Sequence, residues 1–90
     1  MGTDRTFVVA VLYVSYRTEQ KLIQRHQITM QDVEDAILNV RGLHGSWDND
    51  PERGPRLLIR VTIRGRRALI VLYPTINPTE WNLGSAYFRQ

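Results

Sequence analysis

The stretch RGPRLLIRVTIRGRRALIVLYP, from Arg53 to Pro74, decides the fold of this chain. Two runs of aliphatic and β-branched residues flank Arg64-Gly65, a dipeptide that suits the two-residue type I′ turn of a hairpin, with glycine at a positive φ. Pairing across this turn sets Ile63 opposite Arg66, Val61 opposite Ala68, Ile59 opposite Ile70 and Leu57 opposite Leu72. One face of the hairpin is then almost wholly apolar, and a slip of one residue would exchange the two faces.

The opposite face of the predicted hairpin is cationic towards the turn. Arg60 and Arg67 lie diagonally across it, and with Arg64 and Arg66 at the turn we expect one cluster of guanidinium groups. Such a cluster suits phosphate binding. A solvated hairpin tip whose charges keep the strand edge from aggregating explains the same pattern. The pattern alone leaves both interpretations open.

Residues 1–90 have the length of one domain. The chain contains no cysteine, and its net charge is +3. The absence of cysteine excludes disulfides and thiol nucleophiles, and it is typical of a reducing cytoplasm. Residues 53–79 carry six arginines and no acid, which favours nucleic acid or an acidic protein as the partner. Arginine outnumbers lysine by eleven to one, which fits phosphate recognition and equally a bias of the source genome.

The segments before the hairpin predict one strand and two helices. Phe7–Tyr16 reads as a strand buried on both faces, too short for a membrane span. Thr18–His26 is helix-forming with Thr18 as N-cap, and Ile28–Gly42 is a second helix that Gly42 ends. In the second helix, Thr29 and Asp32 fit a capping box, which accounts for the acid without a catalytic role.

The segments around the hairpin complete the order strand, two helices, three strands. Residues 43–55 predict a loop, with a short strand around Leu43–Trp47, and its acids lack the spacing of a calcium loop, so no metal site is expected. Glu80–Phe88 reads as the last strand, with Trp81, Leu83, Ser85 and Tyr87 on one face. This order predicts an α+β fold, with two helices packed on one face of a small antiparallel sheet.

Three strings resemble motifs of the small BrnT-like toxins of the RelE/ParE superfamily. RHQITMQDVEDAI (25–37) is similar to their helix entry, RVTIRGRRALIVLY (60–73) to their glycine-arginine hairpin, and WNLGSAYF (81–88) to their final strand. The strings occur in the family's order and are distributed along residues 16–88. The resemblance implies a RelE-like fold and the toxin of a type II toxin–antitoxin pair, which acts in the cytoplasm and is neutralised by a cognate antitoxin.

Toxins of this kind typically cut mRNA, in some cases on the ribosome, without metal or cofactor. The RNA 2′-hydroxyl attacks its own phosphate, and the protein supplies cations, a proton acceptor and a proton donor. The resemblance matches His26 and Arg66 to family positions. Tyr87 stands where the family commonly has arginine, so the last strand lacks that cation.

From these observations we expect a metal-independent endoribonuclease. Its candidate catalytic residues are His26, Arg60, Arg67 and Tyr87, and its candidate nucleic-acid-binding residues are Arg56, Arg64 and Arg66. His26 as a helix cap and Tyr87 as a packed side chain are the structural alternatives. His44 lies in a glycine-flanked loop with no partner identifiable from the sequence. The alternative function is a non-enzymatic module that binds nucleic acid or a partner protein, such as a degenerate or gyrase-directed toxin.

Overall fold

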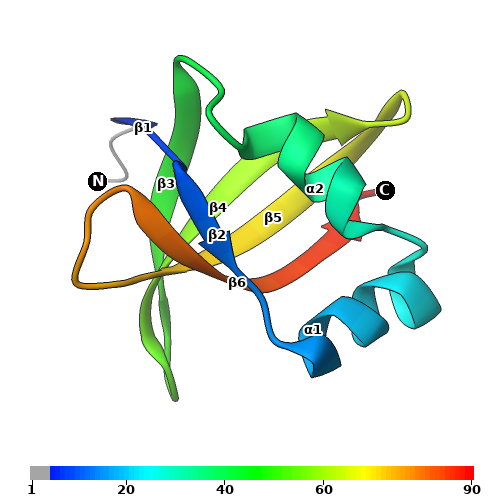
Figure 1. The fold of residues 1–90 in the computed structure, drawn as a ribbon, viewed down its shortest axis with the longest axis horizontal. Coiled ribbons are helices and arrows are strands. Elements are labelled where there is room, and N and C mark those ends of the chain that lie inside the picture. Colours follow the sequence, from blue (N-terminus) through cyan, green and yellow to red (C-terminus); the bar gives the residue numbers. More distant parts are fainter. Residues whose placement is uncertain (1–4) are drawn as a thin grey trace.

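The computed structural model describes residues 5–90 and shows one curled sheet with helices on one side (Figure 1). The elements in chain order are β1 (Arg5–Phe7), β2 (Val11–Tyr13), α1 (Tyr16–Lys21), η1 (Leu22–His26), α2 (Met30–Ile37), β3 (Leu43–Asp50), β4 (Gly54–Ile63), β5 (Arg66–Pro74) and β6 (Glu80–Phe88). Here η1 is one turn of π-helix that continues α1. The described chain is therefore mostly β.

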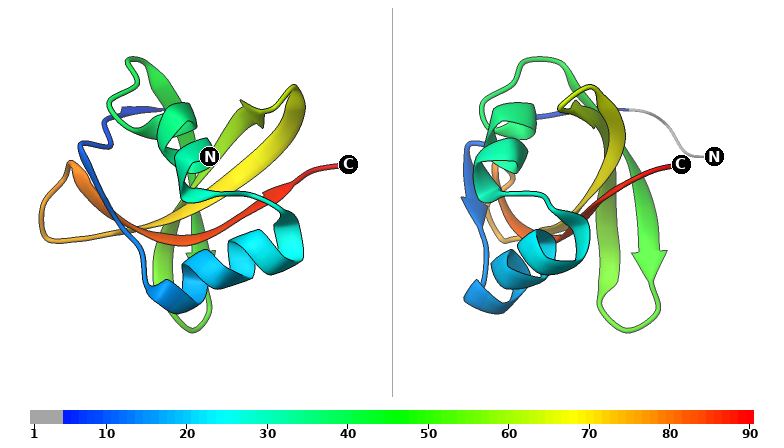
Figure 2. Two further views of the ribbon diagram at one scale, coloured as in Figure 1. Left: turned by 45° about the vertical axis from the view of Figure 1, so that its right-hand side comes forward. Right: turned by 90° about the vertical axis from the view of Figure 1, so that its right-hand side faces the viewer.

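The sheet has six strands in the order β1-β3-β4-β5-β6-β2. All neighbours are antiparallel except β2, which runs parallel to β6. Because β1 and β2 lie at opposite edges and only residues 8–10 join them, the sheet must curl to bring its edges near each other (Figure 2). The predicted RelE-like α+β fold with a small antiparallel sheet is therefore wrong: the sheet is larger, mixed and curled.

The N-terminal segment is one reason for this difference. The expected single strand Phe7–Tyr16 is broken at residues 8–10, and its two halves pair with different neighbours. At the break Val9 is fully buried, and its carbonyl accepts the backbone N–H of Asn39 at 2.8 Å. Since Asn39 directly follows the last residues of α2, a contact 30 positions along the chain bends this segment.

The loop expected at residues 43–55 is the second reason. Instead β3 and β4 form a hairpin with Ser46 opposite Leu58 and Asp50 opposite Gly54. The Asp50 carboxylate accepts the backbone N–H groups of Glu52 and Arg53 and closes the turn. The turn brings the polar segment β3 next to β4. Pairing across the two strands then stabilises β3, although this segment lacks the apolar face that usually stabilises a strand.

The central hairpin β4–β5 has the predicted register. Ile59 pairs with Ile70 and Leu57 with Leu72, which confirms the apolar face. Arg64 (φ 50°) and Gly65 (φ 76°) both have positive φ, as a type I′ turn requires. The apolar face forms the core with residues of the helices: Leu22, Ile28, Val33, Ile37, Leu57, Ile59, Ile63, Ala68, Ile70 and Leu72 are buried there. In Figure 2, α2 and the helix formed by α1 and η1 lie on this side of the sheet.

The helices differ from their predicted limits. The capping box of Thr29 and Asp32 is confirmed, with both reciprocal hydrogen bonds present. However, α2 ends at Ile37 rather than near Gly42, because Leu38 and Asn39 leave the helix to meet Val9. The first helix begins at Tyr16, so its N-cap is Ser15, and the prediction of Thr18 is wrong.

Candidate nucleic-acid interface

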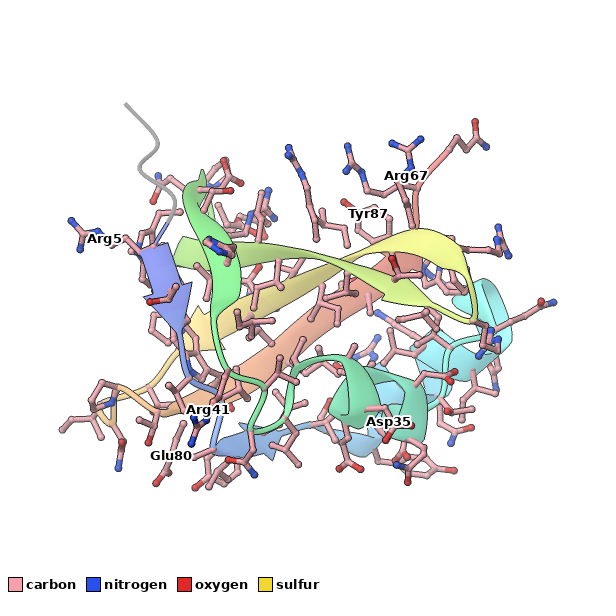
Figure 3. All side chains as sticks on the ribbon, turned by 90° about the horizontal axis from the view of Figure 1, so that it is seen from above. Arg5, Asp35, Arg41, Arg67, Glu80 and Tyr87 are labelled. Atoms are coloured by element: carbon pink, nitrogen blue, oxygen red, sulfur yellow. The ribbon has the colours of Figure 1, made fainter. Side chains whose placement is uncertain are left out.

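The described helices lie on one side of the sheet (Figure 2), and we call the other side the open face. Its central positions are Ser46, Leu58, Arg60, Thr62, Arg67, Leu69, Val71, Ser85 and Tyr87. Figure 3 shows Arg67 and Tyr87 on this side of the sheet, and Asp35 and Arg41 on the side of the helices. Acidic side chains of α2 therefore lie across the sheet from the basic positions of the open face.

Arg60 and Arg67 lie diagonally on the open face, as predicted. Arg60 is opposite Leu69, and Arg67 is opposite Thr62. The two arginines, Thr62 and Arg89 line one shallow depression, where the backbone N–H of Arg89 donates to the Arg67 carbonyl at 2.9 Å. Among residues 5–90, none of these three arginines forms an ion pair with a carboxylate. Their charge is therefore available to an anionic ligand.

Arg64 and Arg66 do not belong to this group. The Arg64 guanidinium pairs with Asp32 and donates to the Gln27 carbonyl at 2.7 Å, which ties the hairpin tip to the start of α2. Arg66 lies over the Phe88 ring at 4.0 Å. Both side chains make their contacts on the helix side of the sheet. The single cluster of four arginines predicted from the pattern is therefore wrong: Arg60 and Arg67 form one group, and Arg64 and Arg66 lie apart from it.

Arg56 lies at the far end of the sheet, where it pairs with two carboxylates. Its Nε is 2.6 Å from Asp48 Oδ2, and its Nη1 is 3.4 Å from Asp50 Oδ2. The Tyr73 hydroxyl also donates to Asp50, at 3.0 Å. The pKa of Asp50 is lowered chiefly because its carboxylate accepts the backbone N–H groups of the turn. Arg56, expected to bind nucleic acid, is thus placed apart from Arg60 and Arg67, and its charge is neutralised by the carboxylates it contacts.

Tyr87 reaches the open face because of a bulge in β6. Leu83 pairs with Leu72, but Ser85 pairs with Val71, so Gly84 is an extra residue between them. Trp81 and Leu83 consequently point into the core, while Tyr87 is 37% exposed. The prediction that all four alternating residues share one face is therefore wrong. A β-bulge re-aims the side chains that follow it, and here it delivers Tyr87 to the open face.

His26 ends η1 beside the C-terminal half of β6. Its ring centroid lies 6.1 Å from that of Tyr87, with the ring planes at 45°. The strand β2 pairs only with Glu80–Asn82, so the helix lies along the part of β6 that β2 leaves unpaired. After His26 the chain turns through Gln27 at φ 57°, which ends the helix at this position. The structure thus brings His26 and Tyr87 together at one margin of the open face.

Two further residues extend the site beyond the sequence prediction. His44 lines a hollow with Ser46, Leu58 and Arg60, and Arg89 joins the other side of Arg60. Arg89 continues the alternation of Ser85 and Tyr87, so the sequence could have predicted it on the same face of the sheet. The sequence could not place His44 on this face, because residues 43–50 lack the apolar alternation of a strand.

The chain matches no protein-family model, and comparison with curated proteins and with solved structures found no match. No group of three His, Cys, Asp or Glu within residues 5–90 is placed to hold a metal ion. In the same part of the chain, none of the helices has the length and apolar character needed to cross a bilayer. The candidate interface therefore rests on the geometry of the open face itself.

Proposed function

We propose that the open face binds single-stranded RNA and cleaves it, so that the chain acts as a ribonuclease toxin in the cytoplasm. One observation carries this proposal: Arg60, Arg67 and Arg89 share a face with the His26–Tyr87 pair, and none of them is paired with a carboxylate within residues 5–90. Guanidinium groups bind phosphate in a fork geometry, and aromatic rings stack on unpaired bases. The combination suits a flexible RNA strand.

The proposed reaction is transesterification within the RNA. The 2′-hydroxyl oxygen attacks the adjacent phosphorus while the bond from phosphorus to the 5′-oxygen breaks, leaving a 2′,3′-cyclic phosphate and a 5′-hydroxyl. His26 takes the proton of the 2′-hydroxyl, since neutral imidazole is the usual base near pH 7. Tyr87 donates its phenolic proton to the leaving oxygen, and solvent restores both groups. Arg60 and Arg67 stabilise the charge that develops on the phosphate.

The resemblance of residues 25–37 and 60–88 to BrnT-like toxins supports the same proposal from the sequence. A cognate antitoxin would then neutralise the chain, with mRNA as the substrate. We propose that acidic or amphipathic antitoxin segments cover the open face in a hetero-oligomer, because its unpaired arginines offer charge complementarity. The proposal rests on these residues and their placement, since the fold is not that of RelE.

A second candidate is a non-enzymatic module that binds RNA or a partner protein on the same face. It is favoured by Tyr87 itself, which stands where the resembling toxins have arginine and leaves the last strand without that cation. Both candidates require Arg60 and Arg67 for binding. They differ in whether the phosphodiester bond is cut, so a cleavage assay separates them.

Binding is tested with Arg60→Ala/Arg67→Ala, with Arg41→Ala as the control because Arg41 is exposed on the other side of the sheet (Figure 3). The double variant should lose about two phosphate contacts. The log–log dependence of RNA affinity on salt should then fall by roughly 1.4, at about 0.7 per contact on a single strand. Fluorescence anisotropy with a labelled RNA at several salt concentrations measures this. A folded double variant with unchanged affinity and salt dependence would contradict the proposal.

Cleavage is tested with His26→Gln and Tyr87→Phe on the same RNA. Loss of a general acid or base should lower kcat by about 10²–10⁴-fold, while RNA affinity stays within a few-fold of wild type. Products with 2′,3′-cyclic phosphate ends identify the reaction. Binding without cleavage in the wild-type protein would support the non-enzymatic module instead.

A further inference from the structure

His44 lies on the open face in register with the proposed RNA site. Ser46 pairs with Leu58 in the antiparallel β3–β4 hairpin. In an antiparallel pair, the residue two positions before Ser46 lies opposite the residue two positions after Leu58, so His44 lies beside Arg60. Both residues line one hollow together with Ser46 and Leu58. This hollow lies on the β3 side of Arg60, away from the depression that Arg60 shares with Arg67.

A row of side chains thus crosses the sheet. Arg60 is opposite Leu69, Leu69 is opposite Tyr87, and the Tyr87 ring lies next to His26. Adjacent strands are about 4.8 Å apart, so the His44 and Tyr87 backbones are roughly 14 Å apart along this row. Because side chains stand roughly perpendicular to a sheet, His44 is placed to contact another part of the RNA strand than Tyr87.

The hollow has the chemistry of a phosphate site. Arg60 offers guanidinium donors, His44 a ring N–H and Ser46 a hydroxyl, all of which donate to phosphate oxygens. His44 is exposed and has no side-chain hydrogen bond within residues 5–90. The nearest acid along β3, Asp48, is paired with Arg56, which also pairs with Asp50.

We propose that His44 and Ser46 hold a second phosphate of the RNA, that Arg60, which lines both the hollow and the depression, donates to this phosphate as well as to the scissile one, and that the strand runs across the β-strands from His26 to His44. This inference rests on the proposed RNA-binding function. Leu69, between the two ends of the row, is half-buried and gives the intervening ribose or base an apolar surface. His44 is then a positioning residue for a strand of several nucleotides, and it takes no part in bond cleavage.

The test compares RNA length. Two 2′-O-methyl oligonucleotides, which cannot be cleaved, are titrated by anisotropy: a dinucleotide with one internal phosphate and a tetranucleotide with three. His44→Ala should weaken the tetranucleotide about tenfold, as expected for one lost charge-assisted hydrogen bond, and leave the dinucleotide unchanged. His44→Lys should restore the tetranucleotide affinity. On cleavable RNA, His44→Ala should raise KM without lowering kcat.

The control is Asn49→Ala, an exposed position further along β3, which should leave both affinities unchanged. Tetranucleotide binding as tight in His44→Ala as in wild type would overturn the second phosphate site and leave the proposed function standing. Equal losses for both oligonucleotides would also overturn it, because His44 would then act on the shared phosphate or on the fold. If the wild-type protein bound neither oligonucleotide, the proposed function and this inference would fail together.

Discussion

The arginines of this chain show how one side-chain type takes different roles. Arg56 pairs with two carboxylates, Arg64 joins the hairpin to α2, and Arg66 covers an aromatic ring. Arg60 and Arg67 have no ion pair within residues 5–90, and they face solvent. Each role depends on the distance to a carboxylate or ring in another segment. Only the residues left unpaired can contribute charge to a ligand.

Asp32 links a local motif to one of these arginines and gives the fold a pH dependence. Its carboxylate accepts the backbone N–H of Thr29 at 3.0 Å and pairs with Arg64. The Thr29 N–H, and secondarily the Arg64 guanidinium, lower the pKa of Asp32 below its ordinary value. A carboxyl group whose pKa is lowered by folding stabilises the fold above its unfolded pKa of about 3.9, and this stabilisation is lost as the pH falls through the folded pKa.

We therefore expect Asp32→Asn to be less stable than wild type at pH 7, and the difference to shrink below about pH 4. Urea unfolding at pH 7, 5 and 3 measures this. Asp35→Asn is the control, because Asp35 is exposed and, within residues 5–90, its carboxylate accepts a hydrogen bond only from the Gln31 side chain, at 2.7 Å. A difference between wild type and Asp32→Asn that is equal at all three pH values would contradict the assignment.

At the scale of the element, β6 depends on the extra residue Gly84. A Cβ at this position would lie 2.3 Å from Cε2 of Tyr73, so the Tyr73 ring occupies the space of a side chain. The same ring is held by the hydroxyl contact with Asp50 and by Arg53, whose guanidinium carbon lies 3.8 Å from the ring centroid. The tyrosine therefore cannot move aside without losing these contacts.

Gly84→Ala should lower the free energy of unfolding by about 1–3 kcal/mol, the range for overpacking a filled site. Because the bulge aims Tyr87, the proposed RNA cleavage should fall as well, even at temperatures where the variant is fully folded. Ser85→Ala, the next residue on the strand, adds no atoms and should change stability by less than about 0.5 kcal/mol. A Gly84→Ala protein with wild-type stability and activity would show that the bulge is not needed.

At the scale of the whole molecule, three aromatic rings join the two ends of the curled sheet. The Phe7 ring of β1 lies 5.8 Å from Trp47 of β3 and 5.9 Å from Trp81 of β6, edge-on to both. The Trp81 indole N–H donates to the Val8 carbonyl at 3.1 Å. Edge-to-face pairs at these distances stabilise beyond the area they bury. The cluster thus holds the N-terminal segment across the gap between the sheet edges.

Phe7→Ala removes two ring contacts at once and should lower the free energy of unfolding by about 2–3 kcal/mol, somewhat less than a fully buried phenylalanine because Phe7 is half-buried. Thermal and urea unfolding measure this. Val8→Ala is the matched control, since Val8 is 52% exposed and its carbonyl is kept. Equal stability of the two variants would mean that the rings do not hold the edges together.

The sequence by itself determined the features whose causes lie within a few residues. The turn at Arg64-Gly65 and the apolar pattern on each side of it set the register of β4 and β5, and Thr29 with Asp32 marked the start of α2. These signals are local because a turn and a cap satisfy backbone groups only a few positions away. The diagonal placement of Arg60 and Arg67 followed from the register alone.

Only the tertiary structure decided how distant segments share the sheet. Val9 bends the N-terminal strand because it meets the end of α2, and the polar segment of β3 becomes a strand because β4 pairs with it. Tyr73 requires the glycine bulge that turns Tyr87 outward. Each of these outcomes depends on side chains far apart in the chain that compete for the same space or hydrogen bond. Residue spacing carries no record of such competition, so only the folded protein shows that His44 lies beside Arg60 and that Tyr87 lies beside His26.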